Sequence, residues 1–485
     1  MTADGDGNVL STIDPKSIKR IHLVGVAGTG MGSFAGMLKA AGYEVTGSDE
    51  NVYPPMSDQL RAWGIDAMAP YAAANLDRAR PDLVIIGNVI RRVNPEATEV
   101  RARGLMSMSF PAALGSLFLQ TRHSIVIAGT HGKTTTSALM GQVLVDAGKD
   151  PTFLVGGVTL DSKGNYRLGK GEHFVVEGDE YDTAYFDKGP KFLHYRPRTV
   201  ILTSVEFDHA DIYRDLAHYT QSFQKLVALM PKDGTLVAAA SYPNVLELAK
   251  ASKSRVLTYE GREGSRADYA PERLRFSGEG ARFIVREQGT ALGEVLLRMG
   301  GAHNVENALG VFAAGRSIGL SFEALAKGIE SFSGVKRRQE PRGEPRGILV
   351  LDDFAHHPTA VRETIAAVKG RYAGRRLWAI FEPRSNTSRR NIHQDDYAHS
   401  FVGADRASIK VPDPHDKIPQ GEGLDVPRLA KELTARGIAS FAAADIPSLL
   451  DEVAQGAKSG DVLLVMSNGA FGGFIDKLLT RLENG

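Results

Sequence analysis

The sequence predicts an α/β protein built from three domains. Its 485 residues exceed the roughly 250 to 300 residues at which a single hydrophobic core stops growing. A buried apolar run, a glycine turn and a helical segment follow one another twice, first from Ile21 and again from Ser124. After Gly347, strand-like runs alternate with helical segments, which is typical of a parallel sheet covered by helices. We therefore expect domains at residues 1–120, 121–340 and 341–485.

The composition excludes several classes of function. Hydrophobic residues make up 42% and charged residues 24%, and 58 basic side chains balance 57 acidic ones. This balance gives no general attraction to nucleic acid or to an anionic membrane. The absence of cysteine excludes disulfides, thiolate nucleophiles and cysteine-ligated metals, and favours a cytoplasmic location. We expect no secretory leader, because the N-terminal stretch MTADGDGNVLSTIDPKS lacks a charged start and an apolar stretch. There is no run of about 18 apolar residues that could span a bilayer.

The first glycine loop follows a predicted strand at residues 21–24, and the next strand of this βαβ unit ends near Asp49. Glycines here admit a pyrophosphate, and an acid after the second strand can bind a ribose. The spacing is not the standard one, because a GxGxxG frame from Gly28 puts Ser33 at the third glycine. A tight strand-to-helix turn is the alternative. The predicted substrate-binding residues are Gly25, Gly28, Gly30, Gly32 and Asp49.

The second glycine loop, GTHGKTTT, lies between a β-branched strand and a helix. Backbone amides can close around phosphate oxygens, Lys133 can reach the terminal phosphates, and the Thr134 hydroxyl can bind Mg²⁺. The generic pattern has its first glycine where this chain has Ile127, so the loop is a shortened variant. A structural turn is again the alternative. The predicted nucleotide-binding residues are Gly129, Thr130, His131, Gly132, Lys133, Thr134 and Thr135.

Two acidic clusters follow buried strands predicted at residues 174–177 and 199–204. They are EGDEYD, which begins at Glu177, and EFDHAD, which contains His209. Carboxylate and imidazole groups at the carboxyl ends of parallel strands suit a divalent cation that bridges to phosphate. Solvated acidic turns are the alternative for either cluster alone.

Three later segments carry weaker signals. HNVEN opens a predicted helix, where Asn304 and Asn307 could cap the backbone or contact a base. DDFAHHP, with Asp353 and His356, suits a ribose-binding or hinge turn. The segment Lys336–Gly347 has no apolar face and is predicted to be a linker or loop.

Seven motifs in this order resemble those of the Mur ligases along nearly the whole chain. They are GVAGTGMG, GTHGKTTT, EGDEYD, EFDHADIY, GAHNVENA, KRRQE and DDFAHHP. The resemblance implies an N-terminal Rossmann-like domain that holds a UDP sugar, a central P-loop ATPase domain and a C-terminal Rossmann-like domain that binds the acceptor. It also implies ATP and Mg²⁺ as cofactors and amide-bond formation as the reaction.

The resemblance assigns roles to particular residues. Lys133, His209 and His356 would be catalytic, and Thr134, Glu177 and His209 would hold the metal. Nucleotide contacts would come from Asn304, Asn307, Arg338 and Asp353. Several relatives use a carbamylated lysine after the metal-binding histidine, but Gln224 occupies that place here and Lys225 follows it. We therefore do not extend the carbamate to this chain.

That difference resembles the branch of the family that uses UDP-N-acetylmuramate itself. Two acceptors fit this branch: L-alanine, and the murein tripeptide L-alanyl-γ-D-glutamyl-meso-diaminopimelate. The segments EGDEYDTAYFDKGPKF, FEPRSNT and VMSNGAFGGF favour the tripeptide. Arg384, Ser385 and Asn386 are candidates for its carboxylates, because arginine offers a bidentate fork; a surface turn is the alternative. The sequence leaves the oligomeric state open.

A different class, the NAD(P)-dependent oxidoreductases, also begins with a unit like the one from Gly25 to Asp49. It would leave the Lys133 loop and both acidic clusters without a role. The ligase accounts for all three features. A noncatalytic nucleotide-binding regulator would also keep the loops, and ATP turnover that requires both the sugar and the amine distinguishes the ligase from it.

Overall fold

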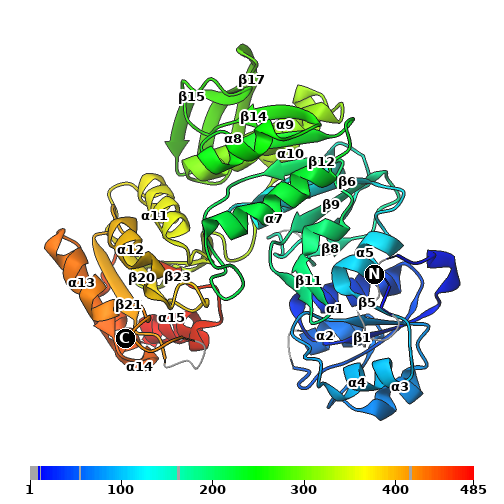
Figure 1. Ribbon diagram of the computed structural model, residues 1–485. Coiled ribbons are helices and arrows are strands. Elements are labelled where there is room, and N and C mark those ends of the chain that lie inside the picture. The colour runs from blue at the N-terminus through cyan, green and yellow to red at the C-terminus, as the bar shows by residue number, and fades with distance from the viewer. Residues whose placement is uncertain (1–8, 11, 54–55, 161–163, 414–417, 485) are drawn as a thin grey trace. The chain divides into compact units, whose positions relative to one another are not determined.

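The computed structural model describes residues 9–10, 12–53, 56–160, 164–413 and 418–484 (Figure 1). Residues 1–8 and 11, on which the expectation of no secretory leader partly rests, lie outside these residues. The chain forms two compact units. Unit 1 comprises residues 1–206, 217–259 and 310–328, and unit 2 comprises residues 207–216, 260–309 and 329–485. The two predicted domain boundaries, near residues 120 and 340, remain a prediction.

The first sheet of unit 1 has five parallel strands in the order β3-β2-β1-β4-β5. The strands are β1 Arg20–Val24, β2 Glu44–Ser48, β3 Asp66–Met68, β4 Leu83–Ile86 and β5 Ser107–Ser109. The helices between and after them are α1 Thr29–Ala40, α2 Met56–Ala62, α3 Ala73–Ala79, α4 Pro95–Ala102 and α5 Phe110–Leu117. Strand order reverses between β1 and β4, so the loop after β1 lies at a switch point, where open α/β sheets bind ligands.

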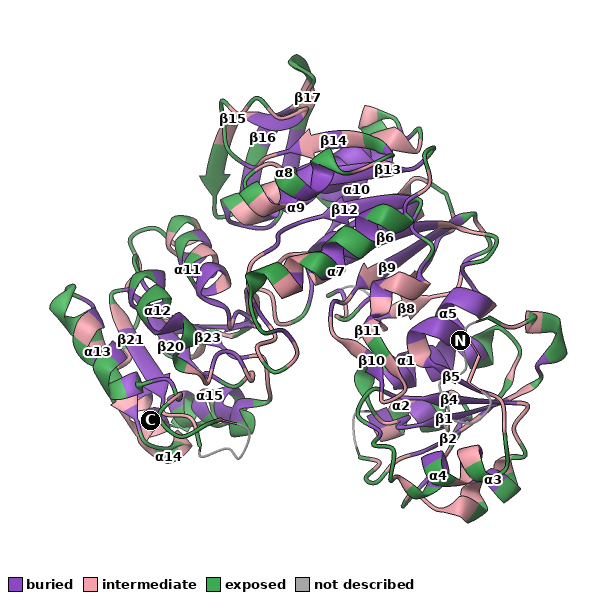
Figure 2. Cartoon of the chain, viewed as in Figure 1, coloured by how far each residue is buried: buried purple, intermediate pink, exposed green. Residues whose placement is uncertain are grey.

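A second group of strands in unit 1 has the order β14-β13-β12-β6-β9-β7-β8. Its central strands are apolar and buried, as expected for parallel strands covered on both faces (Figure 2). The strands are β6 His123–Ala128, β7 Thr152–Leu154, β8 Tyr166–Arg167, β9 His173–Gly178, β12 Thr199–Leu202, β13 Thr235–Ala239 and β14 Arg255–Tyr259. The accompanying helices are α6 Lys133–Asp146, α7 Leu216–Leu229 and α8 Pro243–Lys250.

A hairpin joins the two sheets of unit 1. It consists of β10 Asp182–Ala184 and β11 Asp187–Pro190, which pair antiparallel. At its tip, Tyr185 and Phe186 pack against the apolar core between β1, β4 and the helices α3 and α4. The Tyr185 hydroxyl also accepts a hydrogen bond of 2.9 Å from Arg101 of α4. The hairpin therefore anchors a segment that follows β9 to the N-terminal sheet.

Unit 2 contains an antiparallel meander and a six-stranded sheet. The meander is β15 Tyr269–Ser277, β16 Gly280–Glu287 and β17 Thr290–Leu297. The sheet has the order β18-β19-β23-β20-β21-β22, with strands β18 Glu340–Gly343, β19 Leu349–Asp353, β20 Leu377–Phe381, β21 Arg406–Lys410, β22 Ala439–Ala443 and β23 Val462–Met466. Its helices are α11 Pro358–Arg371, α12 Gln394–Ser400, α13 Val426–Ala435, α14 Ile446–Gly456 and α15 Phe474–Asn484.

Strand β20 shows why this sheet has a core on each face. Successive side chains of a strand point to opposite faces. Leu377, Ala379 and Phe381 belong to one apolar cluster, whereas Trp378 and Ile380 belong to the other. All five are buried, so the run LWAIF is apolar throughout. Helices α9 Ala302–Ser317 and α10 Phe322–Ser331 lie in stretches of chain shared between the two units.

The prediction of a linker at Lys336–Gly347 was wrong in part, because residues 340–343 form the edge strand β18, antiparallel to β19. Charged side chains are compatible with an edge strand, which needs only one neighbour. Arg342 forms ion pairs with Asp352 at 3.1 Å and with Asp476 at 3.0 Å. The strand is therefore held by ion pairs and by its pairing with β19, and it needs no apolar face.

One expected property of the central strands concerns pH. Burial and the nearby His173 lower the pKa of His123 to about 4, against about 6.5 in an unfolded chain. Between these values the unfolded chain binds a proton that the folded chain does not, so the stability falls as the pH falls from 6.5 towards 4. As the pH falls from 6.5 to 4, the melting temperature of a His123→Gln variant should decrease less than that of the parent protein.

The matched control for this experiment is His399→Gln, because His399 lies on the exposed surface of α12. That control should retain the parent slope of melting temperature against pH. Equal slopes for the parent and His123→Gln would contradict the prediction.

No helix among the described residues has both the length and the apolar character needed to cross a bilayer.

Candidate nucleotide-sugar and phosphate site

The first glycine loop is held in place by Asp49. Gly25 has φ +92°, a left-handed conformation that favours glycine, and Gly28 caps α1 without a side chain. The Asp49 carboxylate accepts hydrogen bonds from the Ala27 N–H at 2.8 Å and from the Tyr71 hydroxyl at 3.1 Å. Asp49 therefore shapes the loop, and its role as a ribose ligand remains a prediction.

The other glycines of this loop serve two different purposes. A Cβ at Gly32 would come within 2.2 Å of the Met56 sulfur, so Gly32 allows α1 to pack closely on α2. A Cβ at Gly30 would meet no atom within 4 Å. Packing therefore does not require glycine at position 30, whereas open space over the start of α1 suits an approaching anion.

The second loop is shaped by the residues that follow β12. Gly129 has φ +136°, and a Cβ there would come within 2.3 Å of the Thr203 hydroxyl. Thr203 donates to the His131 carbonyl at 2.5 Å, and the Ser204 hydroxyl accepts from the His131 N–H at 2.8 Å. β12 ends at Leu202, whereas the sequence predicted a strand that extends to Ser204. The polar side chains after the strand hold the phosphate loop.

The Lys133 ammonium is enclosed by its own loop and by the first acidic cluster. It donates to the Gly129 carbonyl at 2.5 Å and pairs with Glu180 at 3.0 Å. Burial would lower the pKa of Lys133, but the carboxylates of Glu180 and Asp179 raise it above the usual value. The lysine is therefore charged at neutral pH, as a phosphate ligand must be.

Glu180 and Tyr219 are functional candidates that the sequence analysis did not single out. The Tyr219 hydroxyl, from α7, lies 3.1 Å from both Glu180 and the Thr130 hydroxyl. Glu180 is part of the quoted EGDEYD motif, but no pattern pairs it with Lys133. On α7, Gln224 and Lys225 are both exposed, and the absence of a carbamate there remains a prediction.

Two of the three predicted metal ligands lie together. The Thr134 hydroxyl donates to one oxygen of Glu177 at 3.2 Å, and the Gly156 N–H donates to the other at 2.6 Å. A hydroxyl and a carboxylate beside a phosphate loop are hard oxygen donors that fit Mg²⁺. The third predicted ligand, His209, belongs to unit 2, where it has φ +53°.

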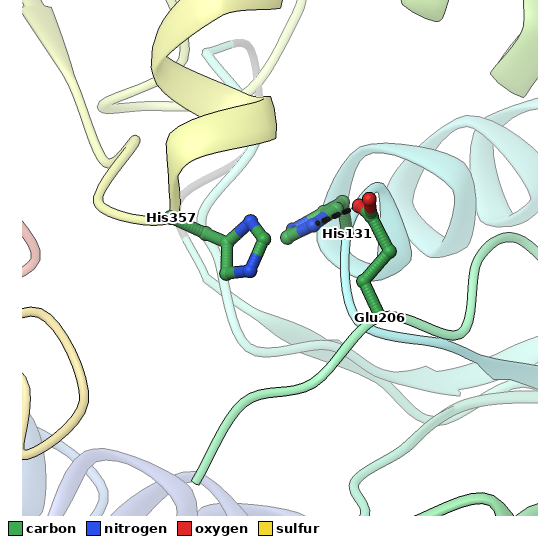
Figure 3. Close-up of side chains that lie close together, drawn as sticks. All are labelled: His131, Glu206 and His357. Carbon is green, nitrogen blue, oxygen red and sulfur yellow. Dashed lines mark hydrogen bonds and ion pairs between the residues drawn. The ribbon is translucent and has the colours of Figure 1, made fainter. Parts of the chain in front are cut away.

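His131 takes part in a different interaction. Its Nε2 lies 2.9 Å from a carboxylate oxygen of Glu206, as the dashed line in Figure 3 shows. The Glu206 backbone carbonyl also accepts a hydrogen bond of 2.9 Å from the Thr130 hydroxyl. The second acidic cluster thus begins with a residue that fixes the phosphate loop.

A cavity of about 570 Å³ extends from the first glycine loop to Glu177. Gly25, Gly28, Gly30 and Asp49, all predicted from the sequence, line one part of it. Val155, Gly156, Glu177, Asp179, Tyr181 and Lys191 line another part. The cavity therefore extends from the glycine loop at Gly25, which resembles a pyrophosphate-binding loop, to the Glu177 carboxylate, which contacts Thr134 of the phosphate loop. A volume of this size falls in the usual range for a ligand pocket.

Lys191 is a lining residue that the sequence did not reveal. Its ammonium lies 3.0 Å from Asp179 and 4.2 Å from the centre of the Tyr181 ring. Burial would lower the pKa of Lys191, but Asp179 raises it above the usual value. The hairpin β10–β11 lies between Asp179 and Lys191 in the chain and brings them together. No local pattern in the sequence predicts this contact.

In unit 2, Asp353 anchors the segment that precedes β18. Its two carboxylate oxygens accept from the backbone N–H groups of Gln339 and Ala355, both at 2.8 Å. Burial raises the pKa of Asp353 although Arg338 opposes the shift. The Arg338 guanidinium lies 4.9 Å from the centre of the Phe354 ring. These contacts fix the turn, and both of its alternative roles, as a hinge and as a ribose contact, remain predictions.

His356 lies near the second acidic cluster within unit 2. Its Nε2 is 3.8 Å from Asp208, and its carbonyl accepts from the Tyr397 hydroxyl at 2.5 Å. Burial would raise the pKa of Asp208, but His356 and His209 hold it well below the usual value. Asp208 thus links His209 and His356, two of the three residues predicted to be catalytic.

Asn304 and Asn307 are both buried near the start of α9. The Asn304 amide donates to the Gly300 carbonyl at 2.8 Å, and the Asn307 amide donates to Asn304 at 3.4 Å. These contacts hold the turn before the helix. A base contact by either residue remains a prediction.

The three predicted acceptor-binding residues follow β20 and differ in their contacts. Asn386 donates to Asp211 at 2.8 Å, and the Ser385 hydroxyl lies 2.9 Å from Ser388. Arg384 is exposed and lies against Gly469, where a Cβ would come within 1.8 Å of the guanidinium. Arg384 is thus the one charged side chain of the three, and it is exposed.

Models of three domains match consecutive parts of the chain. They are the Mur ligase family catalytic domain at residues 20–122, the Mur ligase middle domain at 127–315 and the Mur ligase glutamate ligase domain at 337–469. The chain belongs to the Mur ligase family. Its three-domain α/β architecture is therefore confirmed.

Individual relatives extend over nearly the full length. The UDP-N-acetylmuramate–L-alanyl-γ-D-glutamyl-meso-2,6-diaminoheptandioate ligase of Escherichia coli is 39% identical over 96% of this chain and 98% of its own. The UDP-N-acetylmuramate–L-alanine ligase of Salinibacter ruber is 34% identical over 96% of both chains. Among solved structures, the murein peptide ligase of Psychrobacter arcticus is 36% identical with a TM-score of 0.70, covering 96% of this chain and 99% of that one.

Proposed function

We propose that the protein is an ATP- and Mg²⁺-dependent ligase that joins UDP-N-acetylmuramate to L-alanyl-γ-D-glutamyl-meso-diaminopimelate, in the recycling of peptidoglycan. The observation that carries the proposal is the cavity that extends from the Gly25 loop to Glu177. A UDP sugar that places its diphosphate at the start of α1 would direct its far end towards Glu177. Its carboxylate would then lie beside the phosphate loop.

The chemistry follows from this placement. A carboxylate oxygen of the sugar attacks the γ-phosphorus of ATP, and the bond from that phosphorus to the β-phosphate oxygen breaks. The products are ADP and an acyl phosphate. The neutral amine of the peptide then attacks the acyl carbon, and phosphate leaves as the amide forms and the amine loses a proton. Lys133 would offset charge on the transferred group, and bound Mg²⁺ would neutralise the phosphates.

Two features favour the tripeptide over L-alanine as the acceptor. The relatives named for the tripeptide share more identity with this chain than those named for L-alanine. In addition, the exposed guanidinium of Arg384 could form a bidentate pair with a peptide carboxylate. L-alanine offers only its own α-carboxylate, whereas the tripeptide carries several carboxylates.

The test is ADP release by the purified protein with ATP, Mg²⁺ and UDP-N-acetylmuramate. We expect release with the tripeptide and little with L-alanine. Release with L-alanine alone would assign the protein to the biosynthetic step instead. Binding of NAD(P)H without any ADP release would favour the oxidoreductase alternative.

A further inference from the structure

Lys191 is the one cationic side chain among the described residues that line the cavity. The same lining carries the carboxylates of Asp49, Glu50, Glu177 and Asp179. A UDP sugar is an anion, so such a lining opposes its binding unless a cation or aligned amide groups face its charges. The start of α1 can meet the diphosphate. A carboxylate at the far end of the sugar would need another partner.

The geometry of Lys191 suits that role. Its side chain is 12% exposed, and Asp179 accepts its one hydrogen bond among the described residues. An ammonium has three N–H donors, so two remain for a ligand in the cavity. The Tyr181 ring at 4.2 Å and the Phe110 ring at 5.8 Å lie beside the same ammonium. Two aromatic rings therefore border the ammonium.

The position of Lys191 distinguishes the two anionic ends of the substrate. Its partner Asp179 follows Glu177 by two residues, and Glu177 contacts Thr134 of the phosphate loop. The carboxylate that receives the phosphoryl group must lie at this end of the cavity. The diphosphate is expected at the opposite end, beside the Gly25 loop.

We propose that Lys191 binds the lactyl carboxylate of the UDP-N-acetylmuramate substrate and thereby selects it over UDP-N-acetylglucosamine, which has no lactyl group. Lys191 is then a specificity-determining residue, placed by the hairpin β10–β11. The inference rests on the proposed function, because it takes the cavity to be the UDP-sugar site.

The test measures dissociation constants by calorimetry for UDP, UDP-N-acetylglucosamine and UDP-N-acetylmuramate. In the parent protein, UDP-N-acetylmuramate should bind more tightly than UDP-N-acetylglucosamine. Lys191→Met should reduce this preference by about tenfold or more, the effect of losing one charge-assisted hydrogen bond. Affinity for UDP should be unchanged. The matched control is Lys188→Gln, because Lys188 is 66% exposed on the same hairpin.

An unchanged preference in a folded Lys191→Met protein would overturn the inference. If that variant does not fold, Asp179→Asn provides the test. This variant keeps the Lys191 ammonium and removes the Asp179 carboxylate, which competes with the substrate carboxylate for it. We expect Asp179→Asn to increase the preference for UDP-N-acetylmuramate, and an unchanged or smaller preference would overturn the inference. Failure of the parent protein to bind any of the three nucleotides would instead overturn the proposed function.

Discussion

Replacing Lys133 by alanine should reduce ADP formation by at least about a hundredfold, as expected when a preorganised charge-stabilising group is lost. The side chain does not line the cavity assigned to the sugar, so the affinity for UDP should change little. ADP release measured with all three substrates, together with calorimetry for UDP, tests both parts. An alanine variant with parental turnover would disprove the assignment of the phosphate loop.

The partner of Lys133 must be considered in the same experiment. Glu180 is almost fully buried, and removing the cation from a buried pair costs about 3–5 kcal/mol of stability. The double variant Lys133→Met with Glu180→Gln removes both charges and should regain stability without activity. Lys149→Ala is the matched control, because Lys149 is exposed just beyond the end of α6.

Replacing Glu177 by glutamine should raise the Mg²⁺ concentration needed for half-maximal activity by at least about tenfold. Mutation of residues that only hydrogen-bond to metal ligands already lowers metal affinity by about tenfold to a hundredfold. A glutamine oxygen can still accept from the Gly156 N–H, and its amide can donate to the Thr134 hydroxyl. The local fold should therefore remain, and the change isolates the charge. Titration of ADP release against Mg²⁺ provides the measurement.

Glu172→Gln serves as the control, since Glu172 is 76% exposed immediately before the same strand, β9. It should leave the Mg²⁺ dependence unaltered. A Glu177→Gln variant with the parental Mg²⁺ requirement would remove Glu177 from the metal site.

The sequence predicted β1, β6 and β9 because each is a short apolar run that ends at a glycine or an acidic residue. It did not predict β18, since an edge strand needs no apolar face and its charges pair with Asp352 and Asp476. Periodicity reports burial, and β18 is only partly buried.

The candidate site was predictable where a local motif carries the chemistry. The loops at Gly25 and Lys133 are such motifs, and both have the expected strand and helix around them. The pairing of Lys133 with Glu180, and the return of Lys191 to Asp179, depend on contacts between residues distant in the sequence. No local pattern specifies such contacts. The metal role of His209 and the nucleotide roles of the unit 2 residues remain predictions.

The hairpin β10–β11 affects how far the domains of this family can be exchanged as modules. Its residues belong to the middle of the sequence, yet Tyr185 and Phe186 fill apolar space in the N-terminal sheet. A chimera that replaces only residues 1–120 with those of another family member would present these two side chains to a foreign surface. The N-terminal module that can be transplanted intact therefore includes the hairpin, although more than sixty residues separate it from the end of that segment.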